Sequence, residues 1–217
     1  MKNSILLICV SLLLTFSSSG QGTFQKSYGG ATDDYGYAIQ HTQDGNLVVA
    51  GRSLSYGVGQ YDLYVIKMTP MGDTLWSRTY GNINYDEAFS IDSTSDGGFI
   101  LCGQNSSYDW AGDLFLMKLD ANGGLTWGKT YGGTIGIADA GYAVRQTSDG
   151  GYIATGSTDS YGSGNADVYV VKTDASGTIQ WTRTIGGGSD DVGRDVLQNS
   201  NGDYFIAGYT ESYGEGF

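Results

Sequence analysis

TSDGGYIATGSTDSYGSG, residues 147–164, is one of four closely similar copies of a phrase in this chain of 217 residues. A fixed internal period indicates a repeat architecture, in which each unit buries its apolar surface against neighbouring units. The other copies are TQDGNLVVAGRSLSYGVG from Thr42, TSDGGFILCGQNSSYDWAG from Thr94 and NSNGDYFIAGYTESYGEG from Asn199.

Further elements recur with the same period. A Trp/Phe-x-Lys/Arg-Ser/Thr-Tyr/Ile-Gly element precedes each copy, and an Asp-x-x-x-x-Lys element follows three copies as DLYVIK, DLFLMK and DVYVVK. An aspartate stands shortly before the first apolar segment of each unit. The repeated positions include Trp76, Trp127 and Trp181, then Asp34, Asp86, Asp139 and Asp191, and finally Gly51, Gly103, Gly156 and Gly208.

Each period contains four short apolar segments separated by turn residues. In the third unit they are YAVRQT, GYIATGS, DVYVVKT and TIQWTRTI, which begin at Tyr142, Gly151, Asp167 and Thr178. The Asp-Gly or Asn-Gly pair between the first two segments predicts a hairpin, because such turns need positive φ angles. Four antiparallel strands in a period of about 50 residues are typical of a β-propeller blade. We therefore predict an all-β propeller, with the recurring glycines and aspartates in turns and the tryptophan rings between adjacent sheets.

The repeat also predicts how the chain is divided. The chain ends at Phe217, just before the next third strand is due, so we expect an incomplete, truncated propeller of about four blades from a longer chain. The alternative is a closed four-bladed ring with an incomplete last blade. The expected segments are a signal peptide at 1–20 and repeats over 21–217, comprising an orphan outer strand at 24–30, blades at about 31–81, 82–132 and 133–186, and a partial blade at 187–217.

The first residues of the chain indicate export. Lys2, the apolar run from Ile5 to Phe16 and the small residues after it have the layout of a cleaved secretory signal. The run is too short to span a bilayer, so we expect no membrane span in the mature chain.

The net charge of −12 argues against a nucleic-acid partner. Removing the signal leaves Cys102 as the one cysteine, so no intrachain disulfide is expected.

The order of motifs W-x-K/R-T-Y-G-G, D-D-x-G/A-Y, T-S-D-G-G-Y-I, G-x-T-x-S-Y-G and D-x-Y-V-V-K resembles a known family. It is similar to the propeller repeats of secreted bacterial and archaeal surface proteins, notably those of the Bacteroidetes type. The resemblance covers residues 24–217. It implies an exported or cell-surface propeller, often followed by a C-terminal sorting or adhesion module that this chain lacks, and it implies no reaction.

The search for reactive groups yields no catalytic constellation, because features present in every unit are more economically structural. The aspartate column before the first strands is compatible with a ring of carboxylates that binds cations or sugar hydroxyls. We favour turn capping, or pairing with the strand-end lysines Lys67, Lys118 and Lys172. His41 is the one histidine, in a polar column. No catalytic, metal or cofactor residue is assigned.

The candidate ligand contacts are aromatic residues in the loop between the second and third strands. A rigid scaffold often carries binding residues on such loops, where a ring is free to stack on a glycan. The competing interpretation, which we favour, is a tyrosine that folds back onto its own blade. The candidates are Tyr56, Tyr108, Trp110, Tyr161 and Tyr213.

These observations favour a binding or scaffolding module without catalytic activity, whose partner is an extracellular glycan or protein. The first alternative is a propeller enzyme that acts on polysaccharide, as a glycoside hydrolase or lyase. The second is a structural spacer with no ligand.

Overall fold

The computed structural model describes residues 23–106, 112–133 and 138–213 as strands, turns and loops. The predicted signal segment lies outside these residues. Three sheets have four antiparallel strands and a fourth sheet has two. The strands are β1 (Asp34–His41), β2 (Leu47–Ser53), β3 (Asp62–Met68) and β4 (Thr74–Tyr80); β5 (Asp86–Ser93), β6 (Phe99–Asn105), β7 (Asp113–Leu119) and β8 (Leu125–Tyr131); β9 (Asp139–Gln146), β10 (Tyr152–Thr158), β11 (Asp167–Thr173) and β12 (Ile179–Ile185); and β13 (Asp191–Gln198) and β14 (Tyr204–Thr210).

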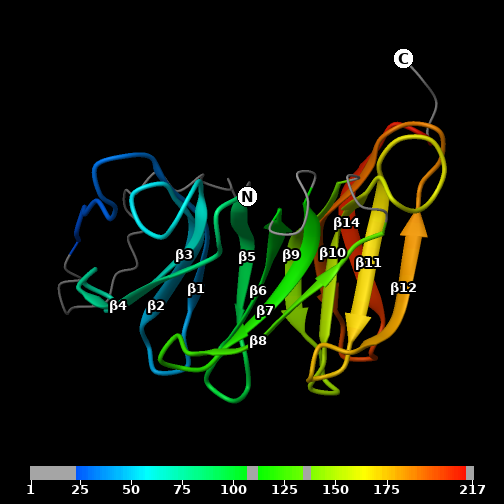
Figure 1. The fold of residues 1–217 in the computed structure, drawn as a ribbon. Coiled ribbons are helices and arrows are strands. Elements are labelled where there is room, and N and C mark those ends of the chain that lie inside the picture. Colours follow the sequence, from blue (N-terminus) through cyan, green and yellow to red (C-terminus); the bar gives the residue numbers. More distant parts are fainter. Residues whose placement is uncertain (1–22, 107–111, 134–137, 214–217) are drawn as a thin grey trace, which may run out of the picture.

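Each sheet is a meander, because its strands pair in chain order. Successive sheets meet through their first strands: β1 contacts β5, β5 contacts β9 and β9 contacts β13. The sheets therefore stand side by side around a common inner line of first strands, with the fourth strands outermost (Figure 1). This is the arrangement of β-propeller blades, and it confirms the predicted fold class.

The hairpin turns adopt the conformation that their sequences predict. The glycine of each Asp-Gly or Asn-Gly pair has a positive φ, which a residue with a Cβ adopts at a cost. These glycines are Gly45, Gly97, Gly150 and Gly202, with φ of 79°, 81°, 80° and 91°.

Three apolar clusters lie between consecutive sheets. In the first cluster, Val48 and Val65 of the first sheet pack against Ile91, Phe99 and other residues of the second. The tryptophan rings contact the next sheet, as predicted. Their ring centroids lie 6.1 Å from Phe99 for Trp76, 5.8 Å from Tyr152 for Trp127 and 5.6 Å from Tyr204 for Trp181. The sheets thus depend on one another for burial.

Residues 24–30 form no strand, although the sequence predicts one. A strand needs a hydrogen-bonded neighbouring strand, and no strand among the residues that the structure describes pairs with this segment. The segment nevertheless occupies the place of an outer strand. The Tyr28 hydroxyl donates to the Gly72 carbonyl oxygen at 2.7 Å, as the Tyr80 hydroxyl of β4 donates to Gly123 of the next sheet at 2.6 Å.

Candidate binding surface

A β-bulge interrupts the first strand of every sheet. In β1 the pairing with β2 shifts between Gly36 and Ala38, so that Tyr37 has no partner in the register. A bulge inserts one extra residue and redirects its side chain. The corresponding bulged residues of β5, β9 and β13 are Phe89, Tyr142 and Arg194.

The repeated glycine opposite each bulge allows the first strand to approach closely. A Cβ on Gly103 would lie 1.8 Å from the carbonyl oxygen of Glu87, which is far inside contact distance. These glycines lie within strands and carry no positive φ, so the close approach of the first strand, and not a turn, requires a glycine at these repeated positions. The other members of the column, Gly51, Gly156 and Gly208, meet the carbonyl oxygens of Tyr35, Ala140 and Val192 at 1.8, 1.7 and 2.0 Å.

The bulged side chains touch from sheet to sheet. The ring centroid of Phe89 lies 5.4 Å from that of Tyr37 and 5.5 Å from that of Tyr142. The Arg194 guanidinium lies over the Tyr142 ring at 4.3 Å. Rings at these separations interact favourably, and a guanidinium over a ring adds a cation–π attraction. We call these four residues, Tyr37, Phe89, Tyr142 and Arg194, the bulge column.

Further rings extend the bulge column at both ends. Tyr35 stacks on Tyr37 with centroids 6.2 Å apart. The Arg52 guanidinium lies 4.6 Å from the Tyr35 ring and 4.1 Å from that of Tyr61, and Tyr61 in turn contacts Tyr85 at 5.8 Å. At the other end Arg194 lies 5.7 Å from the Tyr209 ring. The result is a continuous aromatic and arginine surface, here called the aromatic band, which crosses all four sheets.

The two arginines of the aromatic band differ in their partners. Arg52 forms an ion pair with Glu87, and both side chains are largely buried. Burial alone would lower the pKa of Arg52, but the hydrogen bond and charge of Glu87 hold that pKa above its ordinary value. Arg194 is exposed, and no residue in the described parts of the chain forms an ion pair or hydrogen bond with its guanidinium.

The hydroxyl of Tyr37 stays protonated. Burial, followed by the negative charge of Glu87, raises the pKa of Tyr37. A neutral hydroxyl both donates and accepts hydrogen bonds. Tyr35, Tyr37 and Tyr85 are each 41 to 43% exposed, so a ligand can reach their rings and hydroxyls.

The loop tyrosines that the sequence singles out are tied to the backbone. The hydroxyl of Tyr56 donates to the carbonyl oxygen of Gly29 and that of Tyr161 to Gly132, both at 2.8 Å. Tyr213 makes the equivalent bond to Gly186. Each tyrosine thus fastens its loop to the segment that enters the same unit, although its ring remains partly exposed. Tyr108 and Trp110 lie outside the described residues.

The aspartate column caps the entry to each first strand. The Gly30 amide donates to Asp34 at 2.8 Å, and Asn82, Gly133 and Gly187 donate in the same way to Asp86, Asp139 and Asp191. The hydrogen bond from Ser212 lowers the pKa of Asp191. These carboxylates therefore hold the backbone, as turn-forming aspartates commonly do.

The strand-end lysines pair with a different set of aspartates, so the alternative pairing that we considered was wrong. Each lysine reaches the aspartate of the Asp-Gly turn in its own sheet. The distances are 2.7 Å for Lys67 and Asp44, and 2.9 Å both for Lys118 and Asp96 and for Lys172 and Asp149.

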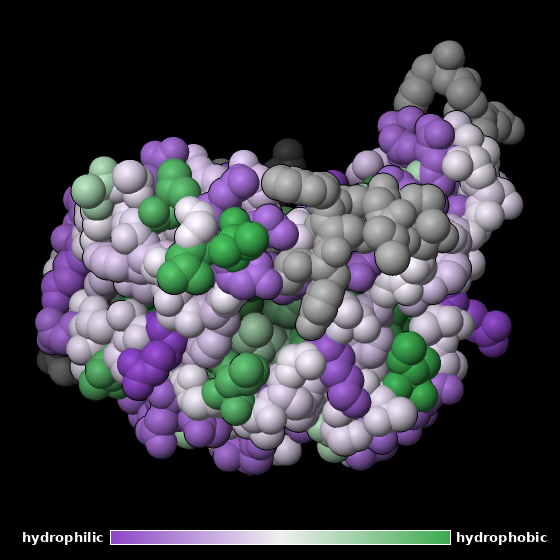
Figure 2. Space-filling model, viewed as in Figure 1, coloured by the Kyte–Doolittle hydropathy of each residue, from purple (hydrophilic) through white to green (hydrophobic). Residues whose placement is uncertain are grey.

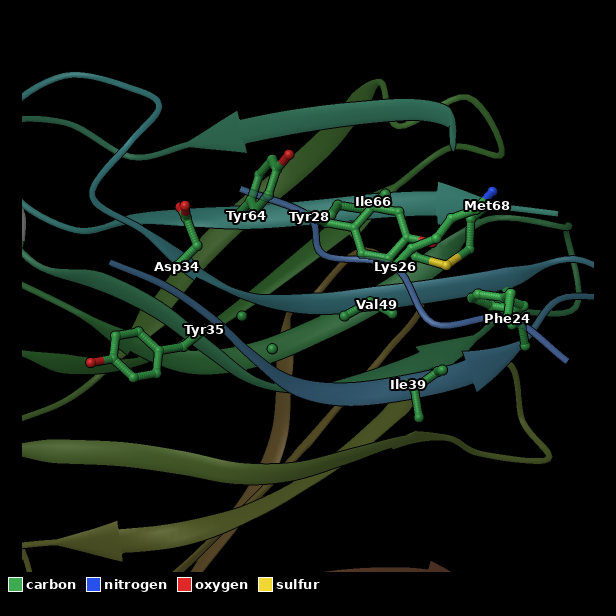
Figure 3. A pocket seen from close by; sticks show the side chains of 13 residues that line it. Phe24, Lys26, Tyr28, Asp34, Tyr35, Ile39, Val49, Tyr64, Ile66 and Met68 are labelled. Carbon is green, nitrogen blue, oxygen red and sulfur yellow. The ribbon is translucent and has the colours of Figure 1, made fainter. Parts of the chain in front are cut away.

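An apolar cavity of about 390 Å³ lies on the face of the first sheet that bears Ile39 and Val49 (Figure 3). Phe24 and Tyr28 cross this face, and Ile66 and Met68 line the cavity from β3. The same face of each later sheet is covered by the preceding sheet. Ile39 is accordingly 56% exposed, whereas its counterparts Ile91, Val144 and Val196 are 3%, 0% and 1% exposed. The residues that line the cavity are therefore of the type that packs against a neighbouring sheet elsewhere in the protein.

The remaining surface offers fewer concentrated features. On the face shown in Figure 2, apolar residues form separate small patches among polar ones. Within the parts of the chain that the structure describes, no cluster of three or more His, Cys, Asp or Glu side chains is arranged to hold a metal ion. Those parts also contain no helix that is long and apolar enough to cross a membrane.

Comparisons with known proteins give limited similarity. No protein-family model and no curated protein sequence matches the chain. Among solved structures, the chain is similar to the WD40 domain of Neurospora crassa Pan2, with a TM-score of 0.40 and 13% sequence identity. The match covers 79% of this chain and 60% of that domain.

Proposed function

We propose that the protein is an exported β-propeller that acts at the cell surface as a binding module without catalytic activity, and that its ligand is a glycan lying along the aromatic band. The observation that carries this proposal is the unbroken contact of Tyr37, Phe89 and Tyr142 across three sheets. The layout of residues 1–20 supports export.

The chemistry of the aromatic band suits a carbohydrate. One face of a pyranose ring is made of C–H groups and packs flat on an aromatic ring, while its hydroxyls project sideways to hydrogen-bonding groups. The phenol hydroxyls of Tyr35 and Tyr37 provide such groups. The rings of Tyr37, Phe89 and Tyr142 stand on backbone bulges, each opposite a glycine, so little conformational freedom is lost when a ligand binds.

A binding role also agrees with the use of the repeated carboxylates. Glycoside hydrolysis commonly needs two carboxyl groups placed on either side of the scissile bond. The repeated aspartates Asp34 and Asp191 accept backbone amides instead, which commits them to the turn.

Calorimetric titration of the mature protein with a panel of soluble neutral and acidic polysaccharides tests the proposal. We expect at least one to bind, and Phe89→Ala to weaken that binding about tenfold or more, equivalent to ~1.4 kcal/mol. Phe205→Ala is the matched control, because Phe205 is 55% exposed on β14 and does not belong to the aromatic band. Absence of binding across the panel, or equal losses in the two variants, would refute the proposal.

A further inference from the structure

The ligand chemistry can be narrowed at the one position of the bulge column that is not aromatic. Three sheets place a ring at the bulge, and the fourth places Arg194. The guanidinium lies over the Tyr142 ring at 4.3 Å and near the Tyr209 ring at 5.7 Å. These two rings hold an otherwise flexible side chain in a defined place.

The hydrogen-bond donors of this guanidinium are available to a ligand. Asp195, the acidic residue next in the chain, forms an ion pair with Arg145 at 2.8 Å. Arg52, at the other end of the aromatic band, is already paired with Glu87. Arg194 is therefore the arginine of the band that has no acidic partner among the described residues.

A guanidinium presents a planar fork of N–H groups that matches the two oxygens of a carboxylate. A ligand that binds both to the Arg194 guanidinium and to the adjoining aromatic rings brings a carboxylate to Arg194 while a ring of the ligand lies on Tyr142 and Phe89. A pyranose with a carboxylate on its own ring, a uronic acid, meets both requirements.

We propose that the aromatic band binds a uronic-acid polysaccharide, with one carboxylate on Arg194 and the sugar ring on the adjoining aromatic residues. This inference rests on the proposed glycan-binding function. It makes Arg194 the residue that distinguishes acidic from neutral chains.

The test uses three uronans, a galacturonan, a glucuronan and an alginate, each beside its carboxyl-reduced counterpart of the same length. Carboxyl reduction removes the charge and keeps the pyranose rings. For at least one uronan we expect the wild-type protein to bind at least tenfold more tightly than it binds the reduced form. Arg194→Gln should abolish that preference, Arg194→Lys should keep part of it, and raising the salt concentration should diminish it.

Arg183→Gln is the control for charge, because Arg183 is exposed on β12 and its substitution changes the net charge by the same amount as Arg194→Gln does. Thermal melting of each variant checks that the fold is retained. Equal affinity for every uronan and its reduced form would overturn the uronate assignment and leave the glycan-binding function standing. A preference that survives Arg194→Gln would overturn the role of Arg194. Failure to bind any uronan or reduced chain would overturn the assignment, and the neutral polysaccharides of the first panel then decide the fate of the function itself.

Discussion

Gly103 lies directly beneath the backbone of Glu87, so close that a Cβ at this position would stand 1.8 Å from the Glu87 carbonyl oxygen. The contact joins a strand that holds the sheet together to the bulge that exposes Phe89. The absence of a side chain at Gly103 therefore allows both the close pairing of β5 with β6 and the bulge that presents Phe89.

We expect Gly103→Ala to lower the free energy of unfolding by about 1–3 kcal/mol, because the obstructing atom is backbone and the two strands must separate. Urea denaturation followed by tryptophan fluorescence measures the change. Gly128→Ala is the matched control: it lies on the outer strand β8, and a Cβ there meets nothing within 4 Å. Equal stability of the two variants would contradict the proposed close approach.

The stability of the protein should depend on pH through Asp62. Burial, and then the negative charge of Asp86, raise the pKa of Asp62 from 3.8 to about 6. The folded protein therefore binds this proton more tightly than the unfolded chain does. The stabilisation is full below about pH 4 and is lost as the pH rises through 6.

Asp62→Asn should remove this dependence. The amide oxygen of asparagine can still accept the Val58 amide, which now donates to Asp62 at 2.8 Å. At pH 8 we expect the variant to be more stable than the wild type by about 1–3 kcal/mol, and at pH 4 we expect the difference to vanish. Chemical denaturation at both pH values measures this, and a constant difference would show that Asp62 does not titrate in this range.

The free energy of unfolding should also depend on pH through the turn aspartates that pair with buried lysines, but in the opposite direction. Hydrogen bonds from Lys172 and then Thr147 hold the pKa of Asp149 at about 2, below its usual value. This stabilisation is present above about pH 4 and is lost as the pH falls towards 2. Lys172 is 2% exposed and also donates to Thr173 and Gln180, so it stays partly satisfied if the carboxylate is removed.

Asp149→Ala should therefore cost about 1–3 kcal/mol at pH 7, since a buried ammonium loses its charged acceptor. Asp73→Ala offers the comparison, because the Asp73 side chain is 72% exposed and its ion pair with Lys26 lies at the surface. We expect that loss to stay within about 0.5 kcal/mol. A smaller cost at Asp149 than at Asp73 would be inconsistent with the buried pairing.

The sequence predicts the blades, the hairpin turns and the inter-sheet tryptophans because each leaves a periodic trace. Asp-Gly pairs and alternating apolar residues are local signals. Trp127 recurs because every sheet needs the same filling. The truncation and the signal segment stay predictions.

The aromatic band was missed because a bulge breaks the alternation on which strand prediction depends. Tyr37 occupies an extra position between Gly36 and Ala38, and simple counting of alternate residues places it on the wrong face. The repeat shows that Gly51 recurs, but the reason is visible only in the structure, where the carbonyl oxygen of Tyr35 excludes a Cβ. Aligning the four first strands would have shown the signal: three rings and an arginine in one column.

The bulged residues belong to none of the three apolar clusters between the sheets. A duplicated unit can therefore exchange this one side chain without disturbing the apolar packing between the sheets. Each blade then contributes one bulged side chain to recognition. Lengthening or shuffling the array changes the order of these side chains, while the scaffold stays the same.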